Sequence, residues 1–365
     1  MKRADGSGRF TRGWERGFGP GPTLLLGALA GGYRGFLGAR EWLYARGVLS
    51  SRALPCAVVS VGNLTVGGTG KTPAVERAVQ TLADLGHRPA VVSRGYRRQS
   101  SGVQIVADTS SIRLDPEDAG DEPFLLARRL PGVPVVVGGN RHDAARLAIE
   151  RFAVTAVVLD DGFQHRTLRK DLEIVMARAR SPWGNGQLLP GGPLREPLSA
   201  LAKADLIVAT GARGASDLAE IEAATALHAP GVPVLAAHYA PVECWEADRM
   251  RMRALSELAG ARLLGFAGIA SPEAFELTLM GLEVGVVEMA TFPDHHWYSP
   301  EDLRALDARV VALRAEGLVT TEKDWVRLRR LPLPKRPLYV ISVRLELSTG
   351  HGEWRKAFER VCPRP

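Results

Sequence analysis

The chain has 365 residues, of which 45% are hydrophobic and 24% charged, a composition typical of a globular protein long enough for two α/β domains. Its three cysteines, Cys56, Cys244 and Cys362, are far apart and form no CxxC pair, so the sequence indicates neither a disulfide framework nor a zinc site and favours a reducing compartment. The net charge of +7 is concentrated in residues 1–50, which hold eight Lys and Arg against three Asp and Glu.

The same N-terminal segment carries the stretch PTLLLGALAGGYRGFLGAREWLYARGVL at residues 22–49. Its apolar core is shorter than the ~20 residues needed to span a bilayer, and no signal-peptide cleavage site follows it. Apolar residues recur at roughly helical spacing, with basic residues near the edges and Trp42 at one end. Such a basic amphipathic helix suits a membrane interface. The alternative is a helix packed on the protein's own core with a basic outer face.

After residue 52 the sequence alternates short Val-rich strands with helices, which predicts a doubly wound parallel sheet in an α/β fold. The expected elements of this part are strands at 56–62, 88–96, 133–139 and 154–162 and helices at 73–86 and 141–152. A stretch dense in Pro and Gly at 181–201 then indicates a boundary or an ordered functional loop.

Beyond that loop, further strands are expected at 204–210, 232–239, 262–270, 317–324 and 337–347. We therefore predict three parts: a basic, membrane-associated N-terminal segment at 1–52, a phosphate-binding domain of the P-loop type at 53–200, and a smaller C-terminal α/β domain at 201–365.

The first strand leads into SVGNLTVGGTGKTP at residues 60–73. A strand, a Gly-rich turn and a helix leave backbone N–H groups pointing at an anion, where the helix N-terminus favours negative charge. Lys71 would reach the β- and γ-phosphates, and the Thr72 hydroxyl would bind magnesium. Thr65 stands where generic loops of this type have Gly. The alternative is a Gly-rich surface turn. The predicted nucleotide-binding residues are Thr65, Val66, Gly67, Gly68, Thr69, Gly70, Lys71 and Thr72.

The strand predicted at 154–162 ends in the pair Asp160 and Asp161. Neighbouring strands of a P-loop sheet deliver a carboxylate beside the magnesium ion. Because side chains alternate at a strand end, the two carboxylates should point differently, one holding the metal or its water and the other orienting Lys71 or the loop. A pair of capping or turn residues is the alternative.

Seven motifs in order resemble those of the tetraacyldisaccharide 4'-kinase family: GNLTVGGTGKTP (62–73), SRGY (93–96), GDEP (120–123), LDDGFQH (159–165), LLPGGPLREP (188–197), FPDHH (292–296) and TTEKD (320–324). Thr65 at the first loop position also matches this family. The resemblance covers residues from about 20 to 325.

The resemblance implies an ATP-dependent lipid kinase of lipid A biosynthesis. With Mg²⁺, such an enzyme transfers the γ-phosphoryl group of ATP to the 4'-hydroxyl of a tetraacylated glucosamine disaccharide 1-phosphate, forming lipid IVA. It also implies a peripheral or monotopic location at the cytoplasmic face of the inner membrane. The acyl chains of the substrate give the N-terminal helix a reason to lie in the membrane surface.

The family pattern indicates Asp121 of GDEP as the base that takes the proton of the sugar hydroxyl, with His295 of FPDHH as its partner. His296 is the alternative histidine, and a helix N-cap is the alternative role of Asp121. The predicted catalytic residues are Asp121, His295, Lys71 and Asp161.

Tyr96, Arg141, Arg195 and Glu196 resemble residues that the family places around its substrates. An arginine at position 195 could grip a phosphate through a bidentate contact. Loop anchoring and ion pairs between the domains are the alternatives. The TTEKD motif is expected to line the cleft, and its role stays open.

Two other functional classes are weighed. A GTPase switch, ATPase switch or metallochaperone would need a guanine-reading motif or a Cys/His metal cluster, and the sequence has neither. A nucleic-acid-binding protein would carry its positive charge on a folded element interleaved with aromatic residues, whereas here the charge lies on an apolar N-terminal segment. We therefore expect a lipid substrate and a membrane surface as partners, with no nucleic acid and no protein partner.

Overall fold

The computed structural model describes residues 20–212 and 214–362. Its strands are β1 Ala57–Gly62, β2 Pro89–Ser93, β3 Gln104–Ala107, β4 Val135–Val137, β5 Ala156–Asp160, β6 Leu172–Arg178, β7 Leu206–Thr210, β8 Val234–Glu246, β9 Arg251–Arg253, β10 Arg262–Ala267, β11 Gly285–Thr291, β12 Gly317–Thr321 and β13 Leu338–Leu347.

The helices of the described residues are α2 Pro20–Ala45, α3 Lys71–Asp84, α4 Pro116–Ala119, α5 Asp121–Arg129, α6 Arg141–Phe152, α7 Ala219–His228, α8 Pro272–Gly281, α9 Pro300–Ala312, α10 Glu322–Leu328 and α11 His351–Val361. Short 3₁₀ turns occur at Leu198–Lys203, Ala215–Leu218 and Leu255–Leu258.

Within the described residues the strands form one sheet of 13 strands, in the order β11-β10-β12-β13-β8-β7-β6-β1-β5-β2-β4-β3, with β9 paired to β8. Most pairs are parallel; the pairs of β3 with β4, β13 with β8 and β8 with β9 are antiparallel. The predicted α/β fold with a largely parallel sheet is confirmed. Val-rich strands such as β1 and β5 are buried on both faces, as expected where helices cover both sides of a sheet.

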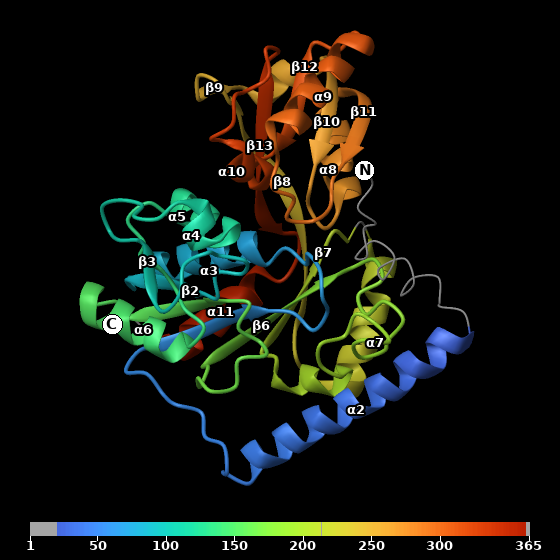
Figure 1. Ribbon diagram of the computed structural model, residues 1–365. Coiled ribbons are helices and arrows are strands. Elements are labelled where there is room, and N and C mark those ends of the chain that lie inside the picture. The colour runs from blue at the N-terminus through green and yellow to red at the C-terminus, as the bar shows by residue number, and fades with distance from the viewer. Residues whose placement is uncertain (1–19, 213, 363–365) are drawn as a thin grey trace.

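The sheet runs through two lobes (Figure 1). The lower lobe holds β1 to β7 and the upper lobe holds β9 to β12 with α8 to α10, and the long strands β8 and β13 pass from one to the other. The first residues of β8 pair with β7 of the lower lobe, and its whole second part pairs with β13. The C-terminal helix α11 returns to pack against α3 and β6 of the lower lobe. The predicted domain boundary at residue 200 stays a prediction. Strands β6 and β7 lie on either side of it in the chain and pair with each other, so the sheet continues across that point.

The helix α2 lies along the outside of the lower lobe (Figure 1). Leu37 is buried in a core cluster with Trp183 and Leu188, and Tyr33 packs against that cluster. Of the predicted N-terminal segment 1–52, residues 1–19 lie outside the described residues. No helix in the described ranges is long and apolar enough to cross a membrane.

Candidate active site

The predicted phosphate cradle lies at the carboxyl end of β1, where α3 begins. Gly70 precedes the helix with φ of 80°, a left-handed conformation that glycine adopts without strain. A Cβ atom at this position would overlap the Tyr239 hydroxyl, so only glycine leaves room for that tyrosine. Gly67 and Gly68 are exposed at the tip of the loop. The loop therefore presents open backbone beside a helix N-terminus, the arrangement that binds phosphate.

The start of the loop is fixed by the segment around Arg195. Thr65 forms a β-bridge with Leu194, and the Val66 amide donates to the Pro193 carbonyl at 2.8 Å. Thr65 is buried, and Thr69 is buried with a hydroxyl that has no protein partner. The bridge accounts for Thr65 at the position where generic loops of this type have Gly, since a residue in a β-bridge need not be glycine.

The Lys71 ammonium lies between Asn63 and Asp161. Its Nζ is 3.2 Å from Asn63 Oδ1 and 3.6 Å from Asp161 Oδ1. Arg195 makes a bidentate contact with Asp161, at 3.0 and 2.9 Å, and also donates to Asn63. Burial alone would raise the pKa of Asp161, but the charge of Lys71 and the contacts of Arg195 outweigh it and lower this pKa to about 2. Asp161 is thus an ionised carboxylate paired with both Lys71 and Arg195.

The neighbouring Asp160 points elsewhere. It ends β5, is buried, and accepts a hydrogen bond from the Ser93 hydroxyl at 2.9 Å through Oδ2. Its Oδ1 is buried without a partner. Burial, with the nearby charges of Glu122 and Asp161, raises the pKa of Asp160. A cation would satisfy the orphaned oxygen and hold the carboxylate ionised.

The expectation that the Asp160 and Asp161 side chains point differently therefore agrees with the geometry. They diverge because Asp161 has φ of 53°, so the chain turns sharply after the strand. The described residues hold no group of three or more His, Cys, Asp or Glu placed around a metal. Mg²⁺ is typically bound by one or two protein oxygens, phosphate oxygens and water, so Asp160 with the Thr72 hydroxyl fits it.

Asp121 and His295 come together from opposite lobes. Asp121 is the first residue of α5, and His295 lies in the loop after β11, 174 positions further along the chain. The His295 Nδ1 atom is 2.8 Å from Asp121 Oδ2. Burial would raise the pKa of Asp121, but the hydrogen bond and charge of His295, with Arg327 and Lys323, lower it to about 2. Burial lowers the pKa of His295 and the contact with Asp121 outweighs this, so the pKa is raised.

The second histidine of the motif faces another way. His296 lies 3.0 Å from Asp302 and stacks on Phe292, with Tyr298 against its edge. Its contacts are therefore structural, and the geometry favours His295 as the partner of Asp121. The alternative role of Asp121 as a helix N-cap is not observed, since the cap residue is Gly120 and its side chain is a hydrogen atom.

Of the predicted substrate residues, Tyr96 lies beside His295 and Arg141 lies near Asp160 and Asp161. Tyr96 is exposed, and its ring meets His295 edge-on with centroids 5.8 Å apart. Arg141 is buried at the start of α6, donates to the Gly139 carbonyl at 2.9 Å, and has a buried Nε without a partner. Burial lowers the pKa of Arg141, and the nearby Asp161 partly offsets this.

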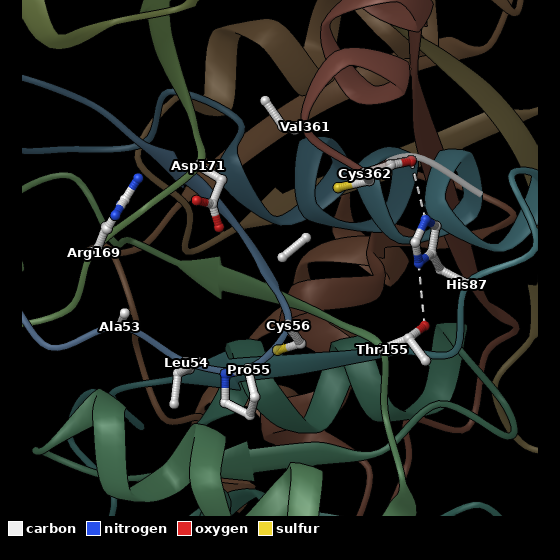
Figure 2. A pocket seen from close by; sticks show the side chains of 11 residues that line it. Ala53, Leu54, Pro55, Cys56, His87, Thr155, Arg169, Asp171, Val361 and Cys362 are labelled. Atoms are coloured by element: carbon white, nitrogen blue, oxygen red, sulfur yellow. Dashed lines mark hydrogen bonds between the residues drawn. The ribbon is translucent and has the colours of Figure 1, made fainter. Parts of the chain in front are cut away.

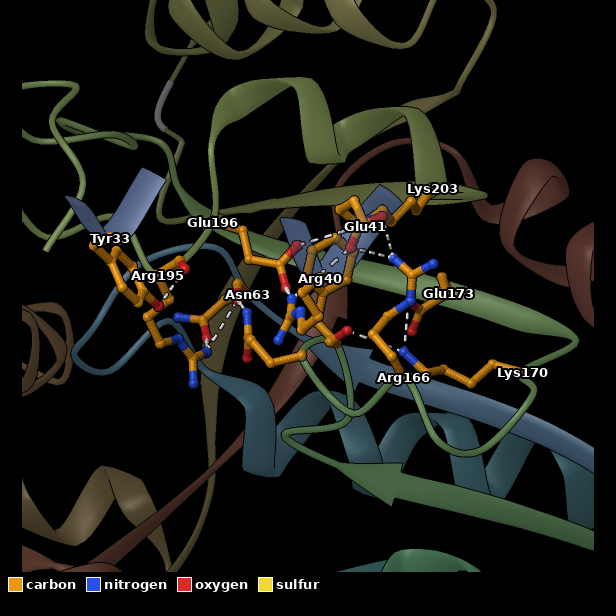
Figure 3. Close-up of polar contacts among 12 residues, drawn as sticks. Tyr33, Arg40, Glu41, Asn63, Arg166, Lys170, Glu173, Arg195, Glu196 and Lys203 are labelled. Carbon is orange, nitrogen blue, oxygen red and sulfur yellow. Dashed lines mark hydrogen bonds and ion pairs between the residues drawn. The ribbon is translucent and has the colours of Figure 1, made fainter. Parts of the chain in front are cut away.

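The other two, Arg195 and Glu196, point in opposite directions (Figure 3). Arg195 faces Asp161 as described above, whereas the buried Glu196 faces α2. Glu196 accepts from Arg40 at 2.7 Å and pairs with Lys203 at 3.4 Å, and the Tyr33 hydroxyl donates to the Arg195 carbonyl at 2.9 Å. The loop of residues 193–197, called the PLREP loop below, thus joins α2 to the phosphate cradle.

Sequence reasoning missed several residues of the site. Glu122 accepts from Thr72 Oγ1 at 3.4 Å and from Lys323 at 2.7 Å, so it connects the cradle to the upper lobe. Burial would raise the pKa of Glu122, but Lys323 outweighs it and the pKa is lowered. Glu122 lies in the GDEP motif and Lys323 in the TTEKD motif, and these positions could have identified both as site residues. Tyr239 lies in a plain strand and gave none.

A hollow of about 530 Å³ lies away from this site (Figure 2). It is lined by Cys56, Thr155 and Asp171, which precede or begin β1, β5 and β6, and by Cys362 after α11. These are the amino ends of the strands, whereas the residues described above gather at the carboxyl ends. The hollow is therefore separate from the candidate active site.

A family model described as LpxK, tetraacyldisaccharide-1-P 4'-kinase, matches residues 22–362. The chain belongs to this family. The resemblance inferred from the seven motifs is thereby confirmed.

Similar proteins extend the match. The tetraacyldisaccharide 4'-kinase of Syntrophus aciditrophicus is 40% identical, with 97% of this chain and 96% of that protein covered. The tetraacyldisaccharide 4'-kinase of Anaeromyxobacter sp. strain Fw109-5 is also 40% identical, over 96% and 95%. A crystal structure of LpxK from Aquifex aeolicus in complex with ATP matches with a TM-score of 0.73 and 30% identity, covering 93% of this chain and 99% of that one.

Proposed function

We propose that this chain is an ATP-dependent lipid kinase that transfers the γ-phosphoryl group of ATP to the 4'-hydroxyl of a tetraacyldisaccharide 1-phosphate. Membership of the tetraacyldisaccharide-1-P 4'-kinase family supports this activity. The structural observation that carries it is that the phosphate cradle lies close to Asp121. The cradle ends at Thr72, whose hydroxyl donates to Glu122, and Glu122 directly follows Asp121 in the chain. A phosphate in the cradle and an acceptor at Asp121 would therefore be neighbours.

The cradle residues bind and orient the donor. Backbone amides of residues 67–70 and the N-terminus of α3 would face the phosphates, and Lys71 would neutralise part of their charge. Asp161 pairs with Lys71 and is itself held by Arg195. Asp160 and Thr72 would hold Mg²⁺, which supplies charge neutralisation at the transferring phosphoryl group.

Asp121 receives the acceptor hydroxyl. At neutral pH it is ionised, so it accepts the hydroxyl's hydrogen bond and aims the oxygen at phosphorus. A carboxylate with a low pKa is a weak base. However, His295 contacts its Oδ2 atom and can share the proton as the new bond forms. Acid would protonate the Asp121–His295 pair and stop this step.

The outer face of α2 supports a membrane-surface location at the cytoplasmic side, where ATP is present. Leu25, Leu29, Phe36 and Trp42 are each more than half exposed on this helix, while Leu37 is buried against the protein. Arg46 lies over the Trp42 ring at 5.1 Å. Exposed apolar side chains beside arginines suit the boundary between headgroups and acyl chains. The contacts of α2 with the PLREP loop would place the site at that surface.

Transfer is tested with γ-labelled ATP and the disaccharide 1-phosphate in mixed micelles. The wild type should produce a bisphosphorylated lipid, and Lys71→Ala should lower transfer by at least about 10²-fold, as expected when a preorganised charge on the transition state is removed. Folded wild-type protein that phosphorylates no acceptor would overturn the proposal.

Membrane docking is tested by vesicle flotation with anionic vesicles. The triple variant Leu25→Glu, Leu29→Glu, Phe36→Glu should lose binding, because three exposed apolar groups that would insert into the membrane surface become charged. The control Val311→Glu changes an exposed apolar residue of α9, 58% exposed, and should float like the wild type. Unchanged flotation of the triple variant would contradict the membrane location.

A further inference from the structure

The TTEKD motif is left without a role by the chemistry above. In the structure β12 ends at Thr321 and α10 begins at Glu322, so the motif is a strand end followed by the first turn of a helix. Asp324 accepts from the Thr321 hydroxyl at 2.6 Å. The motif therefore places Asp324 inside the upper lobe, in contact with Gly268, to which the His295 loop is hydrogen-bonded.

Asp324 is fully buried, and its Oδ1 atom accepts three hydrogen bonds. The donors are the Gly268 amide at 2.8 Å, the Tyr298 hydroxyl at 2.7 Å and Arg327 Nη2 at 2.8 Å. The Gly268 carbonyl in turn accepts from the His295 amide at 3.1 Å. His295 has φ of 59°, an uncommon conformation that the surrounding contacts must hold. Asp324 thus anchors the backbone of the His295 loop.

Arg327 reaches the other member of the pair. Its side chain is 1% exposed, with Nη2 on Asp324 and Nε on the Lys323 carbonyl at 3.2 Å. The remaining Nη1 is buried without a hydrogen-bond partner and lies 3.9 Å from Asp121 Oδ2. That oxygen is the one that contacts His295.

The helices that carry these groups are themselves held together. Arg129 at the end of α5 pairs with Glu322 at the start of α10 at 2.6 Å. Asp121 begins α5, so this contact helps to hold the helix that carries Asp121 against α10.

We propose that Arg327, held by Asp324, is a positioning residue that fixes the Asp121 carboxylate against His295 for the approach of the acceptor hydroxyl. This inference rests on the proposed kinase function. A buried guanidinium with one free nitrogen is a rigid, permanently charged group, which suits it to fixing a carboxylate without taking its proton. Besides Arg327, the charged groups facing Asp121 are His295 and Asp294 of the loop after β11, Lys323 of α10 and Glu122 of α5.

The test compares Arg327→Gln and Arg327→Lys with the wild type in the transfer assay. The Gln side chain can still donate to Asp324 but carries no charge, and the Lys side chain keeps the charge but cannot face both carboxylates. We expect the Gln variant to lower kcat at least tenfold with the KM for ATP within threefold, since the cradle is untouched. The acid limb of its kcat profile should move to higher pH, because the Asp121–His295 pair holds its proton more tightly without the cation. The Lys variant should keep the limb in place but lower kcat, because a lysine cannot contact Asp324 and Asp121 together.

The control is Arg304→Gln, which breaks the exposed pair with Glu301, also three residues apart on a helix, and should match the wild type. A folded Gln variant with wild-type kcat and an unmoved acid limb would overturn the inference. If the Gln variant does not fold, the Lys variant decides, and wild-type kcat in it would overturn the inference. A wild type without transfer would overturn the proposed function and this inference with it, whereas wild-type transfer beside unchanged variants removes the inference alone.

Discussion

Asp121→Asn tests the acceptor half of the site with almost no change in shape. The substitution keeps the size of the side chain and removes its charge, so the acceptor hydroxyl loses its base and His295 loses its ion-pair partner. Positioned bases contribute about 10²- to 10⁴-fold. We expect kcat to fall by that range while the KM for ATP stays within threefold, because Asp121 does not touch the cradle.

The same change has a calculable effect on stability. The pKa of Asp121 is lowered from 3.8 to about 2, and the group is buried, so the shift corresponds to about 2 kcal/mol. Because the folded pKa is depressed, this contribution is present above about pH 4 and is lost as the pH falls towards 2. The Asn variant should therefore unfold more easily than the wild type at pH 7, and the difference should shrink between pH 4 and pH 2.

The assay is initial-rate transfer of labelled phosphate, paired with urea unfolding at pH 7 and pH 3. Asp118→Asn, an exposed aspartate on α4, is the matched control and should change neither quantity. A folded Asp121→Asn enzyme with kcat within threefold of the wild type would refute the role of this carboxylate. Equal stability of the two proteins at pH 7 would refute the electrostatic reasoning.

Three further predictions concern the cradle, the metal and the histidines. Gly70→Ala should weaken ATP binding, measured by calorimetry, because its Cβ would overlap the Tyr239 hydroxyl that covers the loop. The control is Gly86→Ala, which also lies at a positive φ but has nothing within 4 Å, and it should leave ATP binding unchanged. Asp160→Asn should raise the Mg²⁺ concentration for half-maximal transfer more than tenfold without lowering the melting temperature, since a neutral group replaces a buried carboxylate; unchanged Mg²⁺ dependence would contradict the metal assignment. His295→Gln should lower kcat at least tenfold, whereas His296→Gln should lower the melting temperature and leave kcat within threefold; the reverse pattern would exchange their roles.

Much of the lower lobe could be predicted because its signals are local. Val-rich runs, a Gly-Lys-Thr turn and helix boundaries gave β1, α3, α6 and β5 within a few residues of their observed ends. Strand β6 at Leu172–Arg178 was missed, although most of its residues are apolar, because it follows the motif at 159–165 without a helix between. The strand predicted at 317–324 ends at Thr321, where that side chain caps α10.

The parts of the site that sequence could not place depend on contacts between distant segments. Nothing near Asp121 indicates that His295 lies beside it, and only the family resemblance paired them. The opposite directions of Arg195 and Glu196 follow from the way α2 docks on the PLREP loop. The free nitrogen of Arg327 becomes visible only when the burial of α10 is known. Burial and tertiary pairing decide these roles, and both are properties of the folded chain.

The central claim is that the phosphate held at Lys71 passes to a sugar hydroxyl held at Asp121. It is tested most directly by ³¹P NMR of the lipid formed from the disaccharide 1-phosphate, ATP and Mg²⁺. The account predicts a second phosphomonoester signal coupled to the 4' proton of the sugar, together with ADP in equal amount. A product with unchanged phosphorus signals, or ATP hydrolysed to ADP and free phosphate, would contradict it.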